Sequence, residues 1–326
     1  MIVDKPAGPT SHDVVARLRR IYHQRRIGHA GTLDPPATGV LVCGLGRATR
    51  LLRFVQAGTK VYLAEVHFGV ATDTADATGR VTACVPTPVE RAELEAVVGR
   101  FTGEVLQVPP MVSAVQVGGR RLHELARAGL EVERQARRVR IDRIEVLDLR
   151  DGEGAGAEGG APGPVAVLRV TCGSGTYIRS LAVDLGAALG GVAHLGALRR
   201  ERVGPFTLAQ AHALDAIEAD PAGMLLPMAA ATAELPVLVV PAALARRVVH
   251  GAPLPIPPSG PGEAAGRPEP ARDGHGDGHG DGHGDGHGDG HGTLAVHGPD
   301  GELLAVYERR GDELRPVVVV AGPAAA

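Results

Sequence analysis

The chain has 326 residues, 44 % of them hydrophobic, and a formal net charge of −3. This length suits one large domain plus a smaller one. The sequence has neither an apolar run long enough for a membrane helix nor a signal-peptide pattern, so we expect a soluble cytoplasmic protein without membrane contacts. Three widely separated cysteines predict reduced thiols rather than a disulfide framework or a zinc site.

Charge is distributed unevenly along the chain. Residues 1–60 contain ten Lys/Arg and three Asp/Glu, and residues 120–143 contain eight Arg and four acidic residues. Asp-Gly-His repeats add acidic residues near the other end of the sequence. The N-terminal half is therefore basic enough to meet phosphates, although charge alone is more typical of a plain solvated face.

Helix caps and hydrophobic periodicity predict the first elements. Thr10 followed by apolar residues from Val14 to Ile21 predicts a capped amphipathic helix. After it we expect, in order, a Gly/Pro-rich loop at 26–39, a strand at 40–43, a helix near 47–55 and a strand at 61–68. Alternation in the last strand places four side chains on one face: Tyr62, Ala64, Val66 and Phe68.

The middle of the chain has one clear helix-start pattern. Thr87-Pro88-Val89-Glu90 resembles a capping box and predicts a helix that ends by Gly99 or Gly103. Strands are expected near 139–149 and 165–172, on either side of a flexible Gly/Ala/Glu insert at 151–164. A further helix is expected from about Ile178 to Leu189.

A change in composition after about Glu234 predicts two domains, 1–235 and 236–326. The second domain has a hairpin turn at Pro299-Asp300-Gly301. Its candidate strands are 237–240, 294–296, 303–307 and 317–320. A Gly/Asp/His-rich insert at 257–292 is expected to be flexible, with adventitious metal binding by its histidines as the less favoured alternative.

The segment from Arg26 to Gly39 combines several glycines with two prolines in front of a predicted strand. It presents one carboxylate, Asp34, and His29 lies five residues before it. An Asp before Pro is commonly only a turn former, so these residues by themselves leave a purely structural role open.

The complete segment resembles the catalytic motif of the TruB-type pseudouridine synthases, in which Gly-His-x-Gly-x-Leu-Asp-Pro-x-Ala-Thr-Gly surrounds a single essential Asp. The matching residues are Gly28, His29, Gly31, Leu33, Asp34, Pro35, Ala37, Thr38 and Gly39. A match over so long a window rarely arises by chance. The resemblance therefore implies that Asp34 is catalytic.

Other segments resemble the same family in the same order, over roughly residues 3–210. Lys5 to Ser11 is similar to its opening element, and Lys60-Val61-Tyr62 is similar to the strand with the base-stacking tyrosine. Further similar segments are 69–76, a thumb-like RNA-binding segment at about 107–130, a second catalytic motif at 172–179 and a leucine-bearing segment at 194–200.

The resemblance implies roles for individual residues in a T-loop uridine-to-pseudouridine isomerisation on tRNA that needs no metal or cofactor. Asp34 would act at the ribose of a flipped-out nucleotide, Tyr62 would stack on the uracil, and Arg179 would orient Asp34. The other expected substrate contacts are His29, Lys5, Arg120, Arg121, Tyr177 and Leu198. Without the resemblance, Tyr62, Tyr177 and Leu198 are equally compatible with ordinary core positions.

Arg179 also has a local reason to seek a partner. A cation near a helix start is unfavourable with the helix dipole, so Arg179 requires a carboxylate. Asp34 would supply it, and the pairing would keep Asp34 ionised.

The implied fold is α+β, with a catalytic domain around a mixed, largely antiparallel central sheet. A small C-terminal β-rich (PUA-like) domain would follow and touch the acceptor arm of tRNA. We expect a monomer that works on tRNA without a guide RNA.

Two other functions fit parts of the sequence. A tRNA-binding or tRNA-folding chaperone without turnover would use the same basic segments. A glycosidase-like hydrolase would also place a carboxylate at an N-glycosidic carbon, but such enzymes usually employ two carboxylates. Asp73 and Asp76 are the candidates for a second one.

Overall fold

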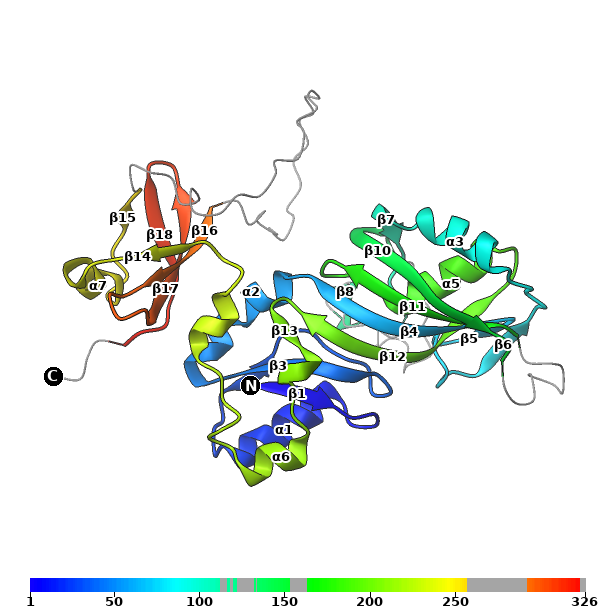
Figure 1. Cartoon of the computed structure of the whole chain (residues 1–326), viewed down its shortest axis with the longest axis horizontal. Helices are drawn as coiled ribbons and strands as arrows, with labels where there is room; N and C mark the ends of the chain where they lie inside the picture. Colours follow the sequence, from blue (N-terminus) through cyan, green and yellow to red (C-terminus); the bar gives the residue numbers. More distant parts are fainter. Residues whose placement is uncertain are drawn as a thin grey trace. The chain divides into compact units, whose positions relative to one another are not determined.

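The computed structural model describes residues 1–111, 116–117, 120–121, 132, 134–152, 163–256 and 292–322. These residues form two compact units, 1–226 and 227–326 (Figure 1). The boundary predicted after residue 235 thus lies inside the second unit. Most of the predicted thumb-like segment, the core of the 151–164 insert and nearly all of the 257–292 insert lie outside the described residues.

The first unit is built on a mixed sheet. Its strand order in the described residues is β1-β3-β12-β4-β11-β10-β7, with β2 paired to β3 and β13 paired to β12. Every pairing in this sheet is antiparallel except that of β12 with β3, which confirms the expected mixed, largely antiparallel sheet. The strands are β1 (Ile2–Lys5), β2 (Ile27–His29), β3 (Thr38–Leu45), β4 (Lys60–Phe68), β7 (Gly103–Gln107), β10 (Arg137–Arg150), β11 (Val165–Cys172), β12 (Ala193–Val203) and β13 (Phe206–Thr207).

Two small hairpins, β5 (Val70–Thr72) with β6 (Val81–Cys84) and β8 (Gln116–Val117) with β9 (Arg120–Arg121), lie outside this sheet. The helices of the first unit are α1 (Ser11–Ile21), η1 (Gly46–Leu51), α2 (Leu52–Ala57), α3 (Arg91–Gly99), α5 (Ile178–Ala188), η3 (Leu208–Gln210) and α6 (Leu214–Ala219).

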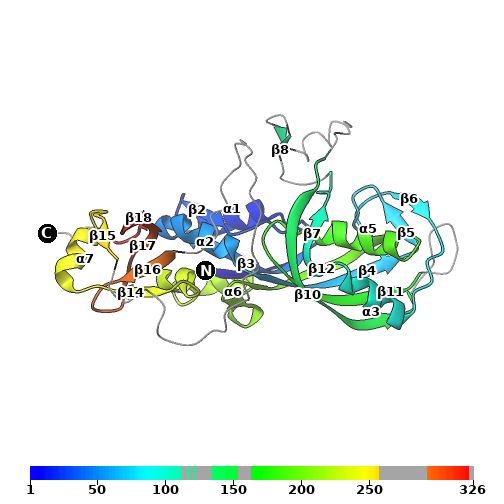
Figure 2. The same ribbon diagram turned by 90° about the horizontal axis from the view of Figure 1, so that it is seen from above.

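The helices form two separate cores against this sheet (Figures 1 and 2). Buried residues of α3 and α5 pack with those of β4, β10, β11 and β12 in one aliphatic cluster. Buried residues of α1 and α6 pack with those of β1, β2 and β3 in another. The loop after β2 therefore extends from one core, and α5 belongs to the other. The two cores adjoin at the middle of the sheet, where β12 pairs with β3 on one side and with β4 on the other.

The predicted cap of α1 is confirmed. The Thr10 hydroxyl accepts a hydrogen bond from the Asp13 amide at 3.1 Å, and the Asp13 carboxylate accepts one from the Thr10 amide at 2.9 Å. This reciprocal pair is a capping box.

The cap predicted at Thr87 is wrong, because α3 begins at Arg91 and Glu90 precedes it without a side-chain cap. The Thr87 hydroxyl instead donates to the Val85 carbonyl at 2.8 Å and accepts from the Val192 amide at 3.2 Å. A contact between distant segments thus outweighs the local signal.

The second unit contains a five-stranded sheet with the order β14-β16-β17-β18-β15. Its elements are η4 (Met228–Thr232), β14 (Val237–Val239), α7 (Ala242–Val248), β15 (Leu254–Pro255), β16 (Thr293–His297), β17 (Leu303–Arg310) and β18 (Glu313–Val319). The predicted turn joins β16 to β17, and Gly301 has the positive φ of 78° that such a turn favours. The expected small β-rich domain is confirmed. Among the described residues, no helix of either unit is long and apolar enough to cross a membrane.

Candidate active site

The loop between β2 and β3 presents Asp34 and is held in place by side chains from outside it. Ser11 on α1 accepts a hydrogen bond from the Leu33 amide at 2.9 Å and donates one to the Leu33 carbonyl at 3.1 Å. Lys5 on β1 donates to the carbonyls of Pro35 at 3.0 Å and Ala37 at 2.7 Å. Asp34 therefore lies on a loop whose neighbouring peptide groups are fixed on both sides.

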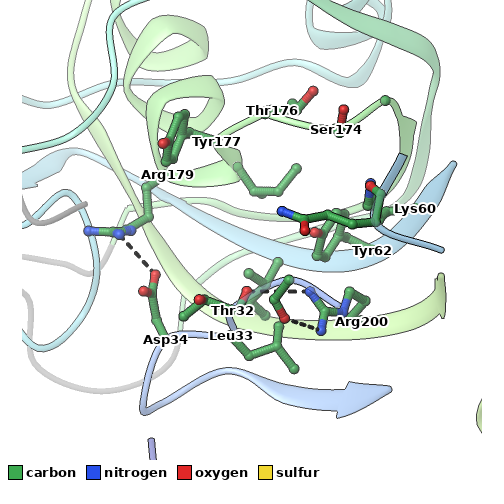
Figure 3. A pocket seen from close by; sticks show the side chains of 16 residues that line it. Thr32, Leu33, Asp34, Lys60, Tyr62, Ser174, Thr176, Tyr177, Arg179 and Arg200 are labelled. Carbon is green, nitrogen blue, oxygen red and sulfur yellow. Dashed lines mark hydrogen bonds and ion pairs between the residues drawn. The ribbon is translucent and has the colours of Figure 1, made fainter. Parts of the chain in front are cut away.

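Asp34 forms an ion pair with Arg179, with 2.9 Å between its Oδ2 atom and Nη2. The Arg179 side chain is only 6 % exposed, whereas that of Asp34 is 37 % exposed. Figure 3 shows the pair at one side of a pocket, with Arg179 coming from the first turn of α5. The carboxylate partner predicted for Arg179 is thus present, and it faces accessible space.

Two opposing effects act on the pKa of Asp34. Burial raises it from the ordinary value of 3.8 and has the largest effect, while the nearby Arg179 and Lys5 cations lower it. The net direction is upward. The pairing favours the ionised form as expected, yet this carboxylic acid is weaker than an ordinary aspartic acid.

A second carboxylate, Asp76, approaches the same guanidinium. Its Oδ2 atom lies 3.8 Å from Nη1 of Arg179, and its Oδ1 atom accepts from the hydroxyls of Thr74 at 2.8 Å and Thr78. Asp73 instead lies at the surface and pairs with Arg80 at 3.2 Å. Of the two acids that the sequence left as candidates, only Asp76 belongs to this site.

A cavity of about 290 Å³ opens beside Asp34, close to the lower end, ~300 Å³, of the range for ligand pockets. Tyr62 on β4, Tyr177 before α5 and Leu198 on β12 line it, as Figure 3 shows for the two tyrosines. The structure thus brings together five of the predicted site residues: Asp34, Tyr62, Tyr177, Arg179 and Leu198.

The position of Tyr177 depends on Gln107 at the end of β7. The buried Gln107 amide accepts from the Tyr177 backbone N–H at 3.0 Å and donates to the Tyr177 carbonyl at 3.3 Å. Ser180 on α5 also donates to the Val108 carbonyl at 2.8 Å. The start of α5 is therefore tied to the strand that leads into the predicted thumb.

Lys5 and His29 do not line this cavity. The Lys5 side chain is fully buried and its ammonium is directed at loop carbonyls, so the structure gives it a supporting position where a substrate contact was expected. His29 lies on β2 with its ring against that of His12, the centroids 5.6 Å apart. Burial lowers the pKa of His29, and its buried Nδ1 has no hydrogen-bond partner among the described residues.

The predicted contacts Arg120 and Arg121 form the two-residue strand β9, which pairs with β8. The backbone of this hairpin is described, but the rest of the thumb-like segment between 112 and 131 lies outside the described residues.

Two buried cations of the cavity were not predicted from the sequence as site residues. Arg200 on β12 and Lys60 on β4 line it although they are 1 % and 5 % exposed. Burial lowers the pKa of Lys60 to about 8. In the sequence neither stands out, because Arg200 lies among Arg199, Glu201 and Arg202 on β12 and Lys60 is the first residue of β4. Their burial is what marks them, since Lys and Arg are rarely buried without a partner. The described residues contain no cluster of His, Cys, Asp or Glu suited to a metal ion.

Family models match most of the first unit. Residues 19–178 match the TruB family pseudouridylate synthase N-terminal domain, and residues 179–231 match the tRNA pseudouridylate synthase B C-terminal domain. Two relatives are named tRNA pseudouridine synthase B. That of Thermobifida fusca is 45 % identical over 99 % of this chain and 98 % of its own, and that of Symbiobacterium thermophilum is 50 % identical over 76 % and 80 %.

Solved structures show the same fold. A structure of an H/ACA ribonucleoprotein bound to a substrate RNA containing 2′-deoxyuridine matches with a TM-score of 0.67 and 26 % identity, over 99 % of this chain and 85 % of that chain. A Cbf5-Nop10-Gar1 complex matches with the same TM-score and coverage at 25 % identity. With Asp34, Arg179 and two tyrosines meeting at one cavity, and a relative of 45 % identity that matches nearly the whole length, this chain belongs to the TruB family of pseudouridylate synthases.

Proposed function

We propose that this protein isomerises a uridine in the T-loop of tRNA to pseudouridine, with Asp34 as the essential carboxylate. The observation that carries the proposal is the partly exposed Asp34, paired with Arg179 at the rim of a cavity of nucleobase size. The names of the relatives support tRNA as the substrate.

The reaction breaks the bond between ribose C1′ and uracil N1 and joins C1′ to C5 of the same base. It therefore requires a carboxylate beside the sugar and a pocket that retains the detached uracil. Asp34 either attacks C1′ as a nucleophile or removes the 2′-proton to give a glycal. In both routes it must be ionised, and Arg179 and Lys5 favour that state.

The cavity supplies the second requirement. Tyr62 stacks on the uracil, while Tyr177 and Leu198 limit its movement after the glycosidic bond breaks. A target stacked inside a tRNA loop must first be flipped out, which costs a few kcal/mol. His29, Arg120 and Arg121 would stabilise the opened loop and its backbone, and loop shape would contribute to recognition.

We infer that the protein acts in the cytoplasm as a monomer, without cofactor or guide RNA. The Thermobifida fusca relative is named as a tRNA enzyme, and the match covers 98 % of its length. The C-terminal sheet would contact the acceptor arm of the tRNA, as a second, smaller point of attachment.

The direct test is incubation of the purified protein with an unmodified tRNA transcript, followed by carbodiimide treatment and reverse transcription. We expect a single block at a T-loop uridine and no change in the mass of the RNA. Free uracil in the reaction would instead indicate hydrolysis. A block at another position would contradict the assigned target.

The matched variants are Asp34→Asn and Asp73→Asn. Asp34→Asn is expected to remove activity by at least about 10⁴-fold, as when a nucleophile or base is deleted, while binding of tRNA persists. Asp73→Asn, which removes a carboxylate paired at the surface with Arg80, should retain the wild-type rate. Undiminished product with Asp34→Asn would refute the enzymatic role of Asp34 and favour a binding protein.

A further inference from the structure

Arg200 occupies a central place in the site without contacting Asp34. It lies on β12 between β3 and β4, directly opposite Gly39 on one side and Tyr62 on the other. Its side chain is among the largest fully buried ones in the described residues, yet it lines the cavity (Figure 3). A Cβ at Gly39 would collide with the Arg200 backbone, so strands β3 and β12 approach each other here as closely as only a glycine allows.

The Arg200 guanidinium donates to main-chain carbonyls of the loop that carries Asp34. Its Nη2 atom lies 3.0 Å from the Gly31 oxygen and its Nη1 atom 3.4 Å from the Thr32 oxygen. Its Nε atom donates to the Val40 carbonyl at 2.8 Å, at the start of the strand that follows the loop. The two ends of the loop are therefore held by one rigid planar group.

The same side chain lies beside Tyr62. Residues directly opposite on antiparallel strands point to the same face, so register holds Arg200 and Tyr62 side by side. The guanidinium charge acts on the Tyr62 phenol, because it opposes the rise in pKa that burial causes there. Arg200 thus connects the ring expected to stack on the base with the peptide groups next to the reacting carboxylate.

No carboxylate pairs with Arg200 within the described part of the chain. A buried cation satisfied only by main-chain carbonyls is costly compared with a neutral, well-packed arrangement. A purely structural need would be met more cheaply if these carbonyls bonded to neutral donors. The cost suggests a function that depends on several donors in one plane.

We propose that Arg200 is a positioning residue that couples Tyr62 to the Asp34 loop, so that the base-stacking ring and the carboxylate keep a fixed spacing during the reaction. The proposal rests on the proposed function for its kinetic consequences, but the coupling itself exists in the free protein. Disturbing it should affect the chemical step more than the binding of tRNA, because a small misplacement of reacting groups costs up to about 10²-fold in rate.

The four tyrosines and the absence of tryptophan make the coupling measurable in the full-length protein. Protein labelled with 3-fluorotyrosine should give four ¹⁹F resonances, and Tyr62→Phe identifies that of Tyr62. Arg200→Lys keeps the charge but loses the planar donor set, and Arg169→Lys is the control, since Arg169 pairs with Glu201 at a half-exposed site. We expect the Tyr62 resonance to move in Arg200→Lys and to stay in Arg169→Lys. An unmoved Tyr62 resonance in Arg200→Lys would overturn the proposal.

Single-turnover kinetics provide the functional half of the test. Arg200→Lys should lower the rate by about 10- to 100-fold and leave tRNA affinity within about twofold. Combined with Tyr62→Phe, its effect should fall short of the product of the single effects by about threefold or more, because the two residues act through one contact. Strictly multiplicative effects would overturn the coupling. If the wild-type protein itself makes no pseudouridine, the proposed function fails while the ¹⁹F result still decides the coupling.

A second measurement covers the case in which Arg200→Lys does not fold. Tyr62→Phe removes only the hydroxyl of the ring beside Arg200, so it changes the surroundings of the guanidinium while Arg200 itself stays intact. In ¹⁵N-labelled protein the amide resonances of the Gly31–Thr32 peptide and its neighbours should then shift. Unchanged loop resonances would show that Tyr62 and the loop are independent.

Discussion

Two glycine-containing segments face each other across the cavity, and they are supported very differently. The loop around Asp34 receives side chains from three other elements, namely Lys5, Ser11 and Arg200, all of which bond to its main chain. The turn 173–176 is held chiefly by the Arg140 carbonyl, which accepts from the Gly173 amide at 2.8 Å and from the Thr176 hydroxyl at 3.4 Å.

This difference is what a base-releasing isomerisation requires. The group that acts on the sugar must keep its place while the uracil detaches and turns, so its loop is fixed from several sides. The opposite wall must accommodate the base in more than one orientation, and a half-exposed turn permits that. Substitutions on the rigid side should therefore have larger effects than substitutions on the adaptable side.

Among the contacts that support Asp34, the largest effect is expected from removing its ion pair with Arg179, which joins the two sides. In Arg179→Met the ion pair of 2.9 Å with Asp34 is lost, and the single-turnover rate should fall about 10³-fold, as for removal of a preorganised charge. The affinity for tRNA should change little. Arg169→Met, which breaks the exposed pair with Glu201, should stay within about twofold. Equal losses in the two variants would remove the special role of Arg179.

Removing a support beneath the rigid loop should give the next largest effect. Lys5→Met leaves the carbonyls of Pro6, Pro35 and Ala37 without their donor, which should lower the free energy of unfolding by about 3 kcal/mol. The loosened loop should also lower the rate, by on the order of 10²-fold. Urea unfolding and single-turnover assays measure the two losses.

The effect of Lys5→Met on the free energy of unfolding should also depend on pH. Burial lowers the pKa of Lys5 from 10.5 to about 8, so between these values the unfolded chain holds a proton that the folded chain has released. The contribution of Lys5 to the free energy of unfolding therefore rises with pH between about pH 8 and pH 10.5. The difference in unfolding free energy between wild type and Lys5→Met should widen from about pH 8 toward pH 10.5. A constant difference would show that Lys5 keeps an ordinary pKa in the fold.

A serine on each side offers a matched pair of smaller changes. Ser11→Ala leaves both the amide and the carbonyl of Leu33 unsatisfied in a buried place, at a cost of about 2 kcal/mol. Ser174→Ala, in the half-exposed turn, should stay within about 0.5 kcal/mol. Thermal or urea unfolding of both variants checks the difference. Similar losses would mean that the two segments are equally constrained.

The sequence was sufficient for most of the fold. Period-two alternation located β4, including the face shared by Tyr62 and Phe68, and the strands expected near 139–149 and 165–172 correspond to β10 and β11. Short elements such as β2 and β13 have too few residues to show a period. The mixed, largely antiparallel character of the sheet was implied by the family resemblance, and its strand order was not predicted, since no local pattern specifies which strands pair.

The site was predictable only where a residue matched a motif. Asp34 and Arg179 lie in two segments that resemble family motifs. The position of Arg179 near a helix start independently predicted that it needs a carboxylate partner. Arg200 ends the matching segment 194–200, but nothing in the sequence singled it out, because its role arises from strands β3 and β4 coming together on either side of it. Lys5 lay in a motif, but nothing in the sequence distinguished a side chain that binds substrate from one that binds the loop beneath it.

The subtlest test concerns the acid limb of the pH–rate profile. Activity requires ionised Asp34 and declines as pH falls through its pKa, which burial raises and which the negative charge of Asp76 raises further. In Asp76→Asn that charge is gone, so the pKa of Asp34 should fall and the limb should move to lower pH. The asparagine keeps an oxygen for the hydroxyls of Thr74 and Thr78. Asp73→Asn supplies the comparison, because its partner is Arg80 at the surface and its limb should not move. A limb displaced to higher pH in Asp76→Asn would mean that Asp76 acts on Asp34 mainly by holding Arg179 in place, and the charge effect would be secondary.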